Sequence, residues 1–172
     1  PKIEQIIADL PNIQMHFEKQ ADKTSLFLND EDVSEEIRSN AVAEVVSKIA
    51  AIGPVREKLV LEQQKMGENG GIIMDGRDIG SVVFPNAELK IFVTANEEVR
   101  VQRRYDELKS KGIQSTLDEV RKNLQERDYI DTHREISPLI QVDDAIILDN
   151  SNLTREEQVD FVLKLIRELN II

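Results

Sequence analysis

Apolar residues follow helical and strand spacing in turn along the first part of the chain. Residues 2–10 place isoleucines and a leucine at helical spacing. Residues 13–17 and 25–28 flank a polar turn, and the alternation in the first run predicts an antiparallel hairpin. Two helices are predicted next, over residues 41–51 and from Val55 to about Met66. The first of them is rich in small apolar residues, so we expect it to be well buried.

Short apolar runs after residue 70 predict the strands of a parallel sheet. The runs at 72–74, 89–93 and 145–149 are bounded by turn residues, as buried strands are. Helices are predicted between and after them, including two that open with a Thr-x-x-Glu capping box, at Thr116 and Thr154. We expect the Thr116 helix to extend up to Pro138. Strands alternating with helices indicate an α/β fold in which helices flank a parallel sheet.

Composition narrows the class of protein. The 172 residues are enough for one compact domain, or for one domain with a small lobe. The chain has no cysteine and two histidines far apart, which excludes disulfides and disfavours a histidine metal site. A net charge of −11 argues against a nucleic-acid-binding surface. No apolar run approaches the ~20 residues that span a bilayer, so we expect a soluble cytoplasmic protein without membrane partners.

Three charged residues surround Gly76 where the predicted strand at 72–74 ends. They are Asp75, Arg77 and Asp78. Open parallel sheets bind ligands at the carboxyl ends of their strands, so this loop is a candidate binding site. The alternative is a polar loop with a local ion pair, and spacing alone leaves both interpretations open.

A second candidate site lies in the segment from Glu126 to Arg134. If this segment is helical, Arg127, Asp131 and Arg134 fall at i, i+4 and i+7 and share one face. Two guanidinium groups with a carboxylate between them could clamp phosphates, because the planar fork of arginine donates two parallel hydrogen bonds. The alternative is an ion-pair ladder on the surface of a helix.

Two residues of the predicted helices at 41–66 are further candidates. Arg56 lies in the first turn of its helix, where a cation opposes the helix dipole, which suggests an anionic or acceptor partner. Ser47 lies among apolar residues of the preceding helix. A hydroxyl bonded back to its own helix is the alternative explanation for such a serine.

Several of these stretches together closely resemble bacterial cytidylate kinases. The resemblance covers residues 5 to about 168. It is carried by DGRDIGSVVFPNAELKIFVTA, by VQRR at 101–104, by ERDYIDTHREISPL and by VDDAIILD, together with residues 29–38 and 54–57. The resemblance implies a P-loop nucleoside monophosphate kinase fold. Residues 1–70 would form the monophosphate-binding lobe and connecting helices, and 71–172 the core sheet, with lid helices at about 112–137.

The same resemblance implies the reaction and the residues that serve it. The γ-phosphoryl group of ATP would pass to CMP or dCMP, with Mg²⁺ as cofactor. Ser47, Arg56 and Asp78 would contact the cytosine base, and Asp131 the ribose hydroxyls. The phosphates would be held by Arg77, Arg127 and Arg134. Asp75 would hold Mg²⁺ through water, and Arg103 or Arg104 would lie on the ATP side.

One expected part of the family is absent from these residues. No G-x-x-x-x-G-K-[ST] segment occurs, although its amide groups and lysine cradle phosphates in the family. We therefore expect a chain truncated at its amino terminus and inactive on its own. Its sheet would lack a neighbour for the strands at 72–74 and 89–93, which favours self-association. The alternatives are a non-catalytic nucleotide-binding or assembly domain of the same fold, and a kinase for another nucleotide such as UMP.

Overall fold

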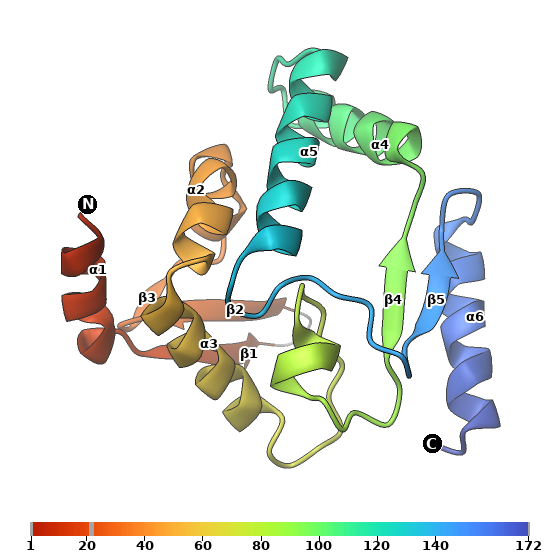
Figure 1. The fold of residues 1–172 in the computed structure, drawn as a ribbon, viewed down its shortest axis with the longest axis horizontal. Helices are drawn as coiled ribbons and strands as arrows, with labels where there is room; N and C mark the ends of the chain where they lie inside the picture. Colours follow the sequence, from red (N-terminus) through yellow and green to blue (C-terminus); the bar gives the residue numbers. More distant parts are fainter. Residues whose placement is uncertain (1, 21–22, 172) are drawn as a thin grey trace. The chain divides into compact units, whose positions relative to one another are not determined.

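The computed structural model describes residues 2–20 and 23–171, and these group into two compact units (Figure 1). The first unit comprises the chain up to Asp75 together with His133–Pro138. The second comprises Gly76–Thr132 and Leu139 onward. The functional boundary expected between residues 70 and 71 stays a prediction.

A small antiparallel sheet forms the first part of unit one. The predicted hairpin is confirmed, since Met15 pairs with Leu28 and Phe17 with Leu26. The sheet also has a short third strand that the sequence did not predict. This strand forms because Asn29 and Asp30 adopt positive φ angles and turn the chain back directly after β2. The elements are α1 (Ile3–Asp9), a 3₁₀ turn (Leu10–Asn12), β1 (Met15–Gln20), β2 (Lys23–Leu28) and β3 (Glu31–Asp32).

Two predicted helices complete the regular structure of unit one. They are α2 (Asn40–Ala50) and α3 (Gly53–Met66), preceded by a 3₁₀ turn at Glu36–Arg38. The hydroxyl of Ser39 accepts a hydrogen bond from the Val42 amide and caps α2. The expected burial of α2 is wrong at Val45 and Val46, which are 48% and 37% exposed. The helix packs mainly on α3 and the preceding 3₁₀ turn, and these leave part of its apolar surface uncovered.

The strand predicted at residues 72–74 is absent. These residues have no regular structure, and Ile73 is 96% exposed. A strand exists only when a neighbouring strand accepts its backbone hydrogen bonds, and residues 72–74 pair with no strand in the described part of the chain. The prediction of a buried strand at residues 72–74 is therefore wrong.

Unit two is built on a pair of parallel strands. β4 (Ile91–Thr94) and β5 (Ile146–Asp149) pair from Ile91 opposite Ile146 to Thr94 opposite Asp149. The other elements are a π-helical turn (Ile79–Val83), α4 (Glu97–Ser110), α5 (Leu117–His133) and α6 (Arg155–Glu168). Figure 1 shows α6 running alongside β5. The expected α/β class, with a helix-flanked parallel sheet and a small antiparallel sheet, is confirmed.

Helices α4 and α5 form a hairpin with a hydrophobic core of its own. Val101 and Leu108 from α4 meet Val120 from α5, and all three are buried. The side chain of Asn96 accepts from the Glu98 amide and caps α4. The predicted capping box starts α5, since Thr116 and Glu119 each accept a hydrogen bond from the other's amide. The chain turns between the helices at Gly112, whose φ of 72° favours glycine.

The hairpin core gives a stability prediction. We expect Val101→Ala to lower the free energy of unfolding by about 2 kcal/mol, because Val101 is 1% exposed and its loss leaves a cavity. The measurement is the shift of the urea midpoint at unchanged slope. Val159→Ala is the matched control, since that helical valine is 56% exposed and should cost less than about 0.5 kcal/mol. Equal losses in the two variants would contradict the assignment of the core.

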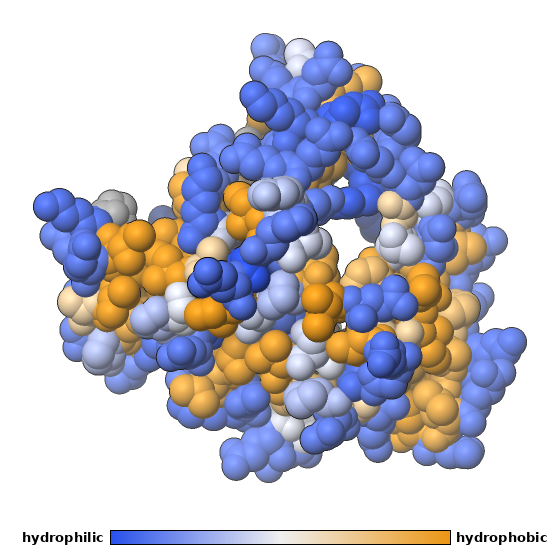
Figure 2. Space-filling view, in the orientation of Figure 1, coloured by the Kyte–Doolittle hydropathy of each residue, from blue (hydrophilic) through white to orange (hydrophobic). Residues whose placement is uncertain are grey.

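Apolar side chains remain at the surface over the sheet of unit two. Figure 2 shows them in the region of β4, β5 and α6, where Val93, Ile147 and Val159 are each more than half exposed. Among the described residues, no helix combines the length and the apolar character that crossing a membrane requires.

Candidate functional site

The loop before the π-helical turn positions Arg77 and Asp78. The backbone carbonyl of Asp78 accepts hydrogen bonds from the amides of Val82 and Val83, which anchors the turn. Asp78 itself is 2% exposed. A Cβ atom at Gly76 would lie 2.9 Å from Cγ1 of Ile79, so a larger residue there would force the Ile79 side chain to shift. The sequence thus folds this loop into a fixed frame for two charged side chains.

Helix α5 carries the other half of the site. Arg127 and Asp131 lie one turn apart, as their spacing predicted. The Oδ2 atom of Asp131 lies 3.0 Å from Nε of Arg77 and 3.9 Å from Nε of Arg127. Asp131 is 3% exposed. Two guanidinium groups from distant parts of the sequence therefore converge on one buried carboxylate, and we call Arg77, Arg127 and Asp131 the arginine–aspartate cluster.

The electrostatics of this cluster favour an anion. Burial lowers the pKa of Arg127, the positive charge of Arg77 lowers it further, and Asp131 partly offsets both effects. Arg104 also lowers the pKa of Arg127, so a third cation acts on the same group. Nε of Arg127 is buried and has no hydrogen-bond partner among the described residues. Positive charge in excess of one carboxylate, with a donor still to be satisfied, is the arrangement that a phosphate group completes.

Four predicted site residues belong to unit one, namely Ser47, Arg56, Asp75 and Arg134. Arg134 directly follows His133, the last residue of α5, so the helix on which the i+7 spacing depended does not extend to Arg134. Nε of Arg134 instead donates to the carbonyl of Ser137 at 2.7 Å. Arg56 is 9% exposed and lies in the first turn of α3, and Ser47 is half-buried in α2. Their part in a common site with the arginine–aspartate cluster stays a prediction.

Arg103 and Arg104 hold different partners within unit two. The two terminal nitrogens of Arg103 donate to the side-chain and backbone oxygens of Asn150, both at 2.8 Å. Arg104 donates to Glu107 on its own helix at 2.8 Å. Arg103 therefore fastens α4 to the loop after β5. Sequence reasoning missed Asn150, because nothing in the chain connects residues that lie 47 positions apart.

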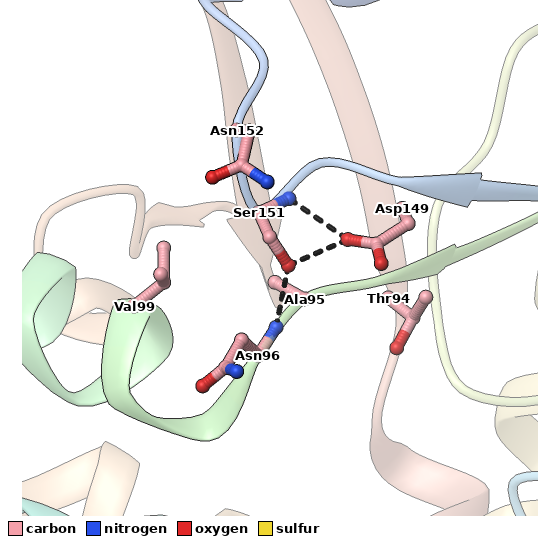
Figure 3. Close-up of a pocket in the computed structure, with 7 residues that line it drawn as sticks. All are labelled: Thr94, Ala95, Asn96, Val99, Asp149, Ser151 and Asn152. Atoms are coloured by element: carbon pink, nitrogen blue, oxygen red, sulfur yellow. Dashed lines mark hydrogen bonds between the residues drawn. The ribbon is translucent and has the colours of Figure 1, made fainter.

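An open pocket of about 470 Å³ lies where β4 and β5 end, as Figure 3 shows. The hydroxyl of Ser151 donates to Oδ1 of Asp149 at 2.6 Å and accepts from the Asn96 amide at 2.7 Å. Hydrogen bonds from the hydroxyl and the amide of Ser151 hold the pKa of Asp149 below its usual value. The pocket is lined by Thr94, Ala95, Asn96, Val99, Asp149, Ser151 and Asn152.

The polar residues after two of the predicted strands could have indicated this pocket. Polar residues directly follow the strands predicted at 89–93 and 145–149, and the carboxyl ends of parallel strands meet at one edge of a sheet. The pocket offers a carboxylate, a hydroxyl and an amide beside the apolar side chain of Val99. It therefore suits a polar group better than a purely apolar one.

Asp75, the candidate for Mg²⁺, is an exposed carboxylate at the end of unit one. The described residues contain no group of three or more His, Cys, Asp or Glu side chains that could hold a metal ion. Mg²⁺ is usually bound by one or two carboxylates together with water and substrate phosphates, so a single carboxylate fits this ion.

Known proteins match nearly the whole chain. The family model described as cytidylate kinase matches residues 2–168. A cytidylate kinase of Flavobacterium psychrophilum is 54% identical over 168 residues, which cover 96% of this chain and 74% of the relative. That of Flavobacterium johnsoniae is 54% identical over 168 residues, covering 96% and 73%. That of Fusobacterium nucleatum is 48% identical over 167 residues, covering 97% and 75%.

Proposed function

The chain belongs to the cytidylate kinase family, and from this membership we propose that it transfers the γ-phosphoryl group of ATP to CMP or dCMP. The products are ADP and CDP or dCDP. The fold class is that of the nucleoside monophosphate kinases, with a parallel sheet flanked by helices and a small antiparallel sheet.

The arginine–aspartate cluster is the observation that carries the proposal. Phosphoryl transfer requires little covalent chemistry from the protein, and it depends on positioning the nucleotides and on neutralising the charge of the transferred group. Arg77 and Arg127 supply that charge from two separate elements. Asp131 keeps the two guanidinium groups together before a phosphate arrives, so less reorganisation is needed when it binds.

The acceptor nucleotide would be recognised by buried polar side chains. We assign the cytosine base to Ser47, Arg56 and Asp78, and the ribose hydroxyls to Asp131. Asp78 and Arg56 are both buried, which suits side chains that select a base by hydrogen bonds. A carboxylate accepts from the exocyclic amino group of cytosine, and an arginine donates to its ring nitrogen and carbonyl. Arg134 would join Arg77 and Arg127 in holding phosphates.

The ATP side would lie at the carboxyl edge of β4 and β5. The pocket in Figure 3 supports this assignment, and Arg103 supports it indirectly by fixing Asn150 beside the pocket. Arg104 would add positive charge, as its effect on the pKa of Arg127 indicates. Mg²⁺, when bound, would neutralise phosphate charge, and Asp75 would hold it through water.

The remaining assignments concern partners and location. We propose that copies of the chain associate through the sheet of unit two, because Val93 and Ile147 expose apolar surface on β4 and β5. The net charge of −11 supports small nucleotides rather than nucleic acid as partners. A cytoplasmic location fits a kinase that uses free nucleotides.

A coupled assay of ADP release with CMP, dCMP, UMP and AMP tests the proposal. We expect kcat/KM for CMP or dCMP to exceed that for UMP and AMP by about 10³-fold or more, because buried partners left unsatisfied penalise the wrong base. Activity restricted to UMP or AMP would overturn the cytidine assignment. Nucleotide binding without turnover of any of the four would instead favour a non-catalytic domain of the same fold.

A further inference from the structure

Two bidentate ion pairs join α4 to α5. Arg100 donates through both terminal nitrogens to the carboxylate of Asp128, at 2.6 and 3.0 Å. Arg121 donates in the same way to Glu98, at 2.6 and 2.7 Å. A planar fork that meets a carboxylate at two points fixes orientation as well as distance. The two pairs therefore constrain how α5 is rotated against α4.

The two pairs differ in their surroundings. The side chains of Arg100 and Asp128 are 34% and 32% exposed, whereas that of Glu98 is 71% exposed. Water screens the Glu98 pair more strongly, so that pair holds the helices less firmly. The Arg100–Asp128 pair is thus the firmer of the two constraints.

Asp128 also lies next to the arginine–aspartate cluster. It directly follows Arg127 and precedes Asp131 by three residues on the same helix. Its negative charge raises the pKa of Arg127, against the lowering by burial and by Arg77. A rotation of α5 that broke the contact with Arg100 would also move Arg127 and Asp131. Displacements of about 1 Å in groups that position a substrate can cost about 10²-fold in rate.

We propose that Arg100 and Asp128 form a positioning pair, which sets the rotation of α5 so that Arg127 and Asp131 meet Arg77. This inference rests on the proposed function, because the position of Arg127 matters where phosphates bind. Neither residue of the pair needs to touch a nucleotide. Arg100 holds Asp128, and Asp128 holds the turn of α5 that carries Arg127 and Asp131.

A double-mutant cycle tests the pair. Arg100→Gln and Asp128→Asn should each lower kcat for CMP by about 10- to 30-fold, with KM for CMP changed by less than about threefold. The double variant should be no slower than the worse single variant, because both changes remove the same contact. If the fold-loss of kcat in the double variant equals the product of the two single losses, the residues act independently and the proposed positioning pair is wrong.

Glu98→Gln is the matched control, since it removes the other bidentate pair between the same helices. It should leave kcat within about twofold of the parent, although it removes a similar contact. If Asp128→Asn and Glu98→Gln change kcat equally, or if Asp128→Asn lowers only the melting temperature, the positioning role is wrong.

A measurement without turnover separates this inference from the proposed function. Binding of inorganic tripolyphosphate by calorimetry should weaken at least about tenfold in Asp128→Asn and remain unchanged in Glu98→Gln. If the parent protein phosphorylates no nucleotide, the proposed function fails. The comparison of tripolyphosphate affinities still tests whether Arg100 and Asp128 form a positioning pair. Equal tripolyphosphate affinity in the parent and Asp128→Asn would overturn it.

Discussion

Replacing Arg127 with methionine is expected to lower kcat/KM for CMP phosphorylation by about 10³-fold, the scale seen when an arginine that stabilises phosphoryl transfer is removed. Methionine keeps much of the length and the helical preference of the side chain but removes the charge. The guanidinium group of Arg127 lies with that of Arg77 around Asp131, and its buried Nε atom has no hydrogen-bond partner among the described residues. Steady-state rates of ADP release at varied CMP and ATP measure the effect.

Arg167→Met is the control for that experiment. Arg167 is an exposed arginine in the last turn of α6, so the same change should leave kcat/KM within about twofold. The melting temperature of each variant should accompany the rates. A folded Arg127→Met variant with kcat/KM within tenfold of the parent would remove Arg127 from the phosphate site.

Asp78→Asn is expected to have the second large effect, on the choice of base. The carboxylate can only accept hydrogen bonds, which suits the amino group of cytosine, whereas the amide can also donate to the carbonyl of uracil. We expect the ratio of kcat/KM for CMP to that for UMP to fall by about 10³-fold. Parallel assays with the two nucleotides measure the ratio.

The ratio of kcat/KM for CMP to that for UMP also distinguishes a change of base preference from a loss of folded protein. Asp78 is 2% exposed, so its replacement could reduce stability, but unfolding would lower both rates together. Asp160→Asn, an exposed position on α6, should leave the ratio unchanged. A folded Asp78→Asn variant that still prefers CMP as strongly as the parent would assign base recognition to other residues.

Local signals in the sequence predicted most elements of the fold. The capping boxes at Thr116 and Thr154 act through hydrogen bonds that close within three residues, so the sequence states them directly. The antiparallel hairpin follows from alternation on both sides of a turn. The Arg127–Asp131 spacing held because it also depends on a single helix turn.

Two errors concern the end of a helix and the pairing of a strand. The end of α5 was placed at Pro138, yet the helix ends at His133 and Ser137 adopts a φ of 51°. Proline disfavours helical geometry in the residue before it, but how much earlier the helix stops depends on local packing. The run at 72–74 failed as a strand because composition cannot supply a pairing partner.

The sequence predicted only part of the candidate site, because the site joins residues that are distant in the chain. Charged residues in the loop at 75–78 and on α5 could each be found from spacing, but their meeting at Asp131 could not. The pair of Arg103 with Asn150, and the pocket beside it, join segments whose approach is set by the pairing of β4 with β5. Only the resemblance to a family linked Arg77 with Arg127 beforehand.

The separate core of the α4–α5 hairpin has a consequence for protein engineering. Val101, Leu108 and Val120 stabilise the hairpin from within, whereas Asp78 lies in a loop outside it. Arg127, on the hairpin, and Asp78, in the loop, are thus supported by different sets of contacts. A library that diversifies the surroundings of Asp78 but keeps its neighbour Arg77 can retain the hairpin unaltered, so acceptor preference becomes adjustable while Arg127 and Asp131 keep their support.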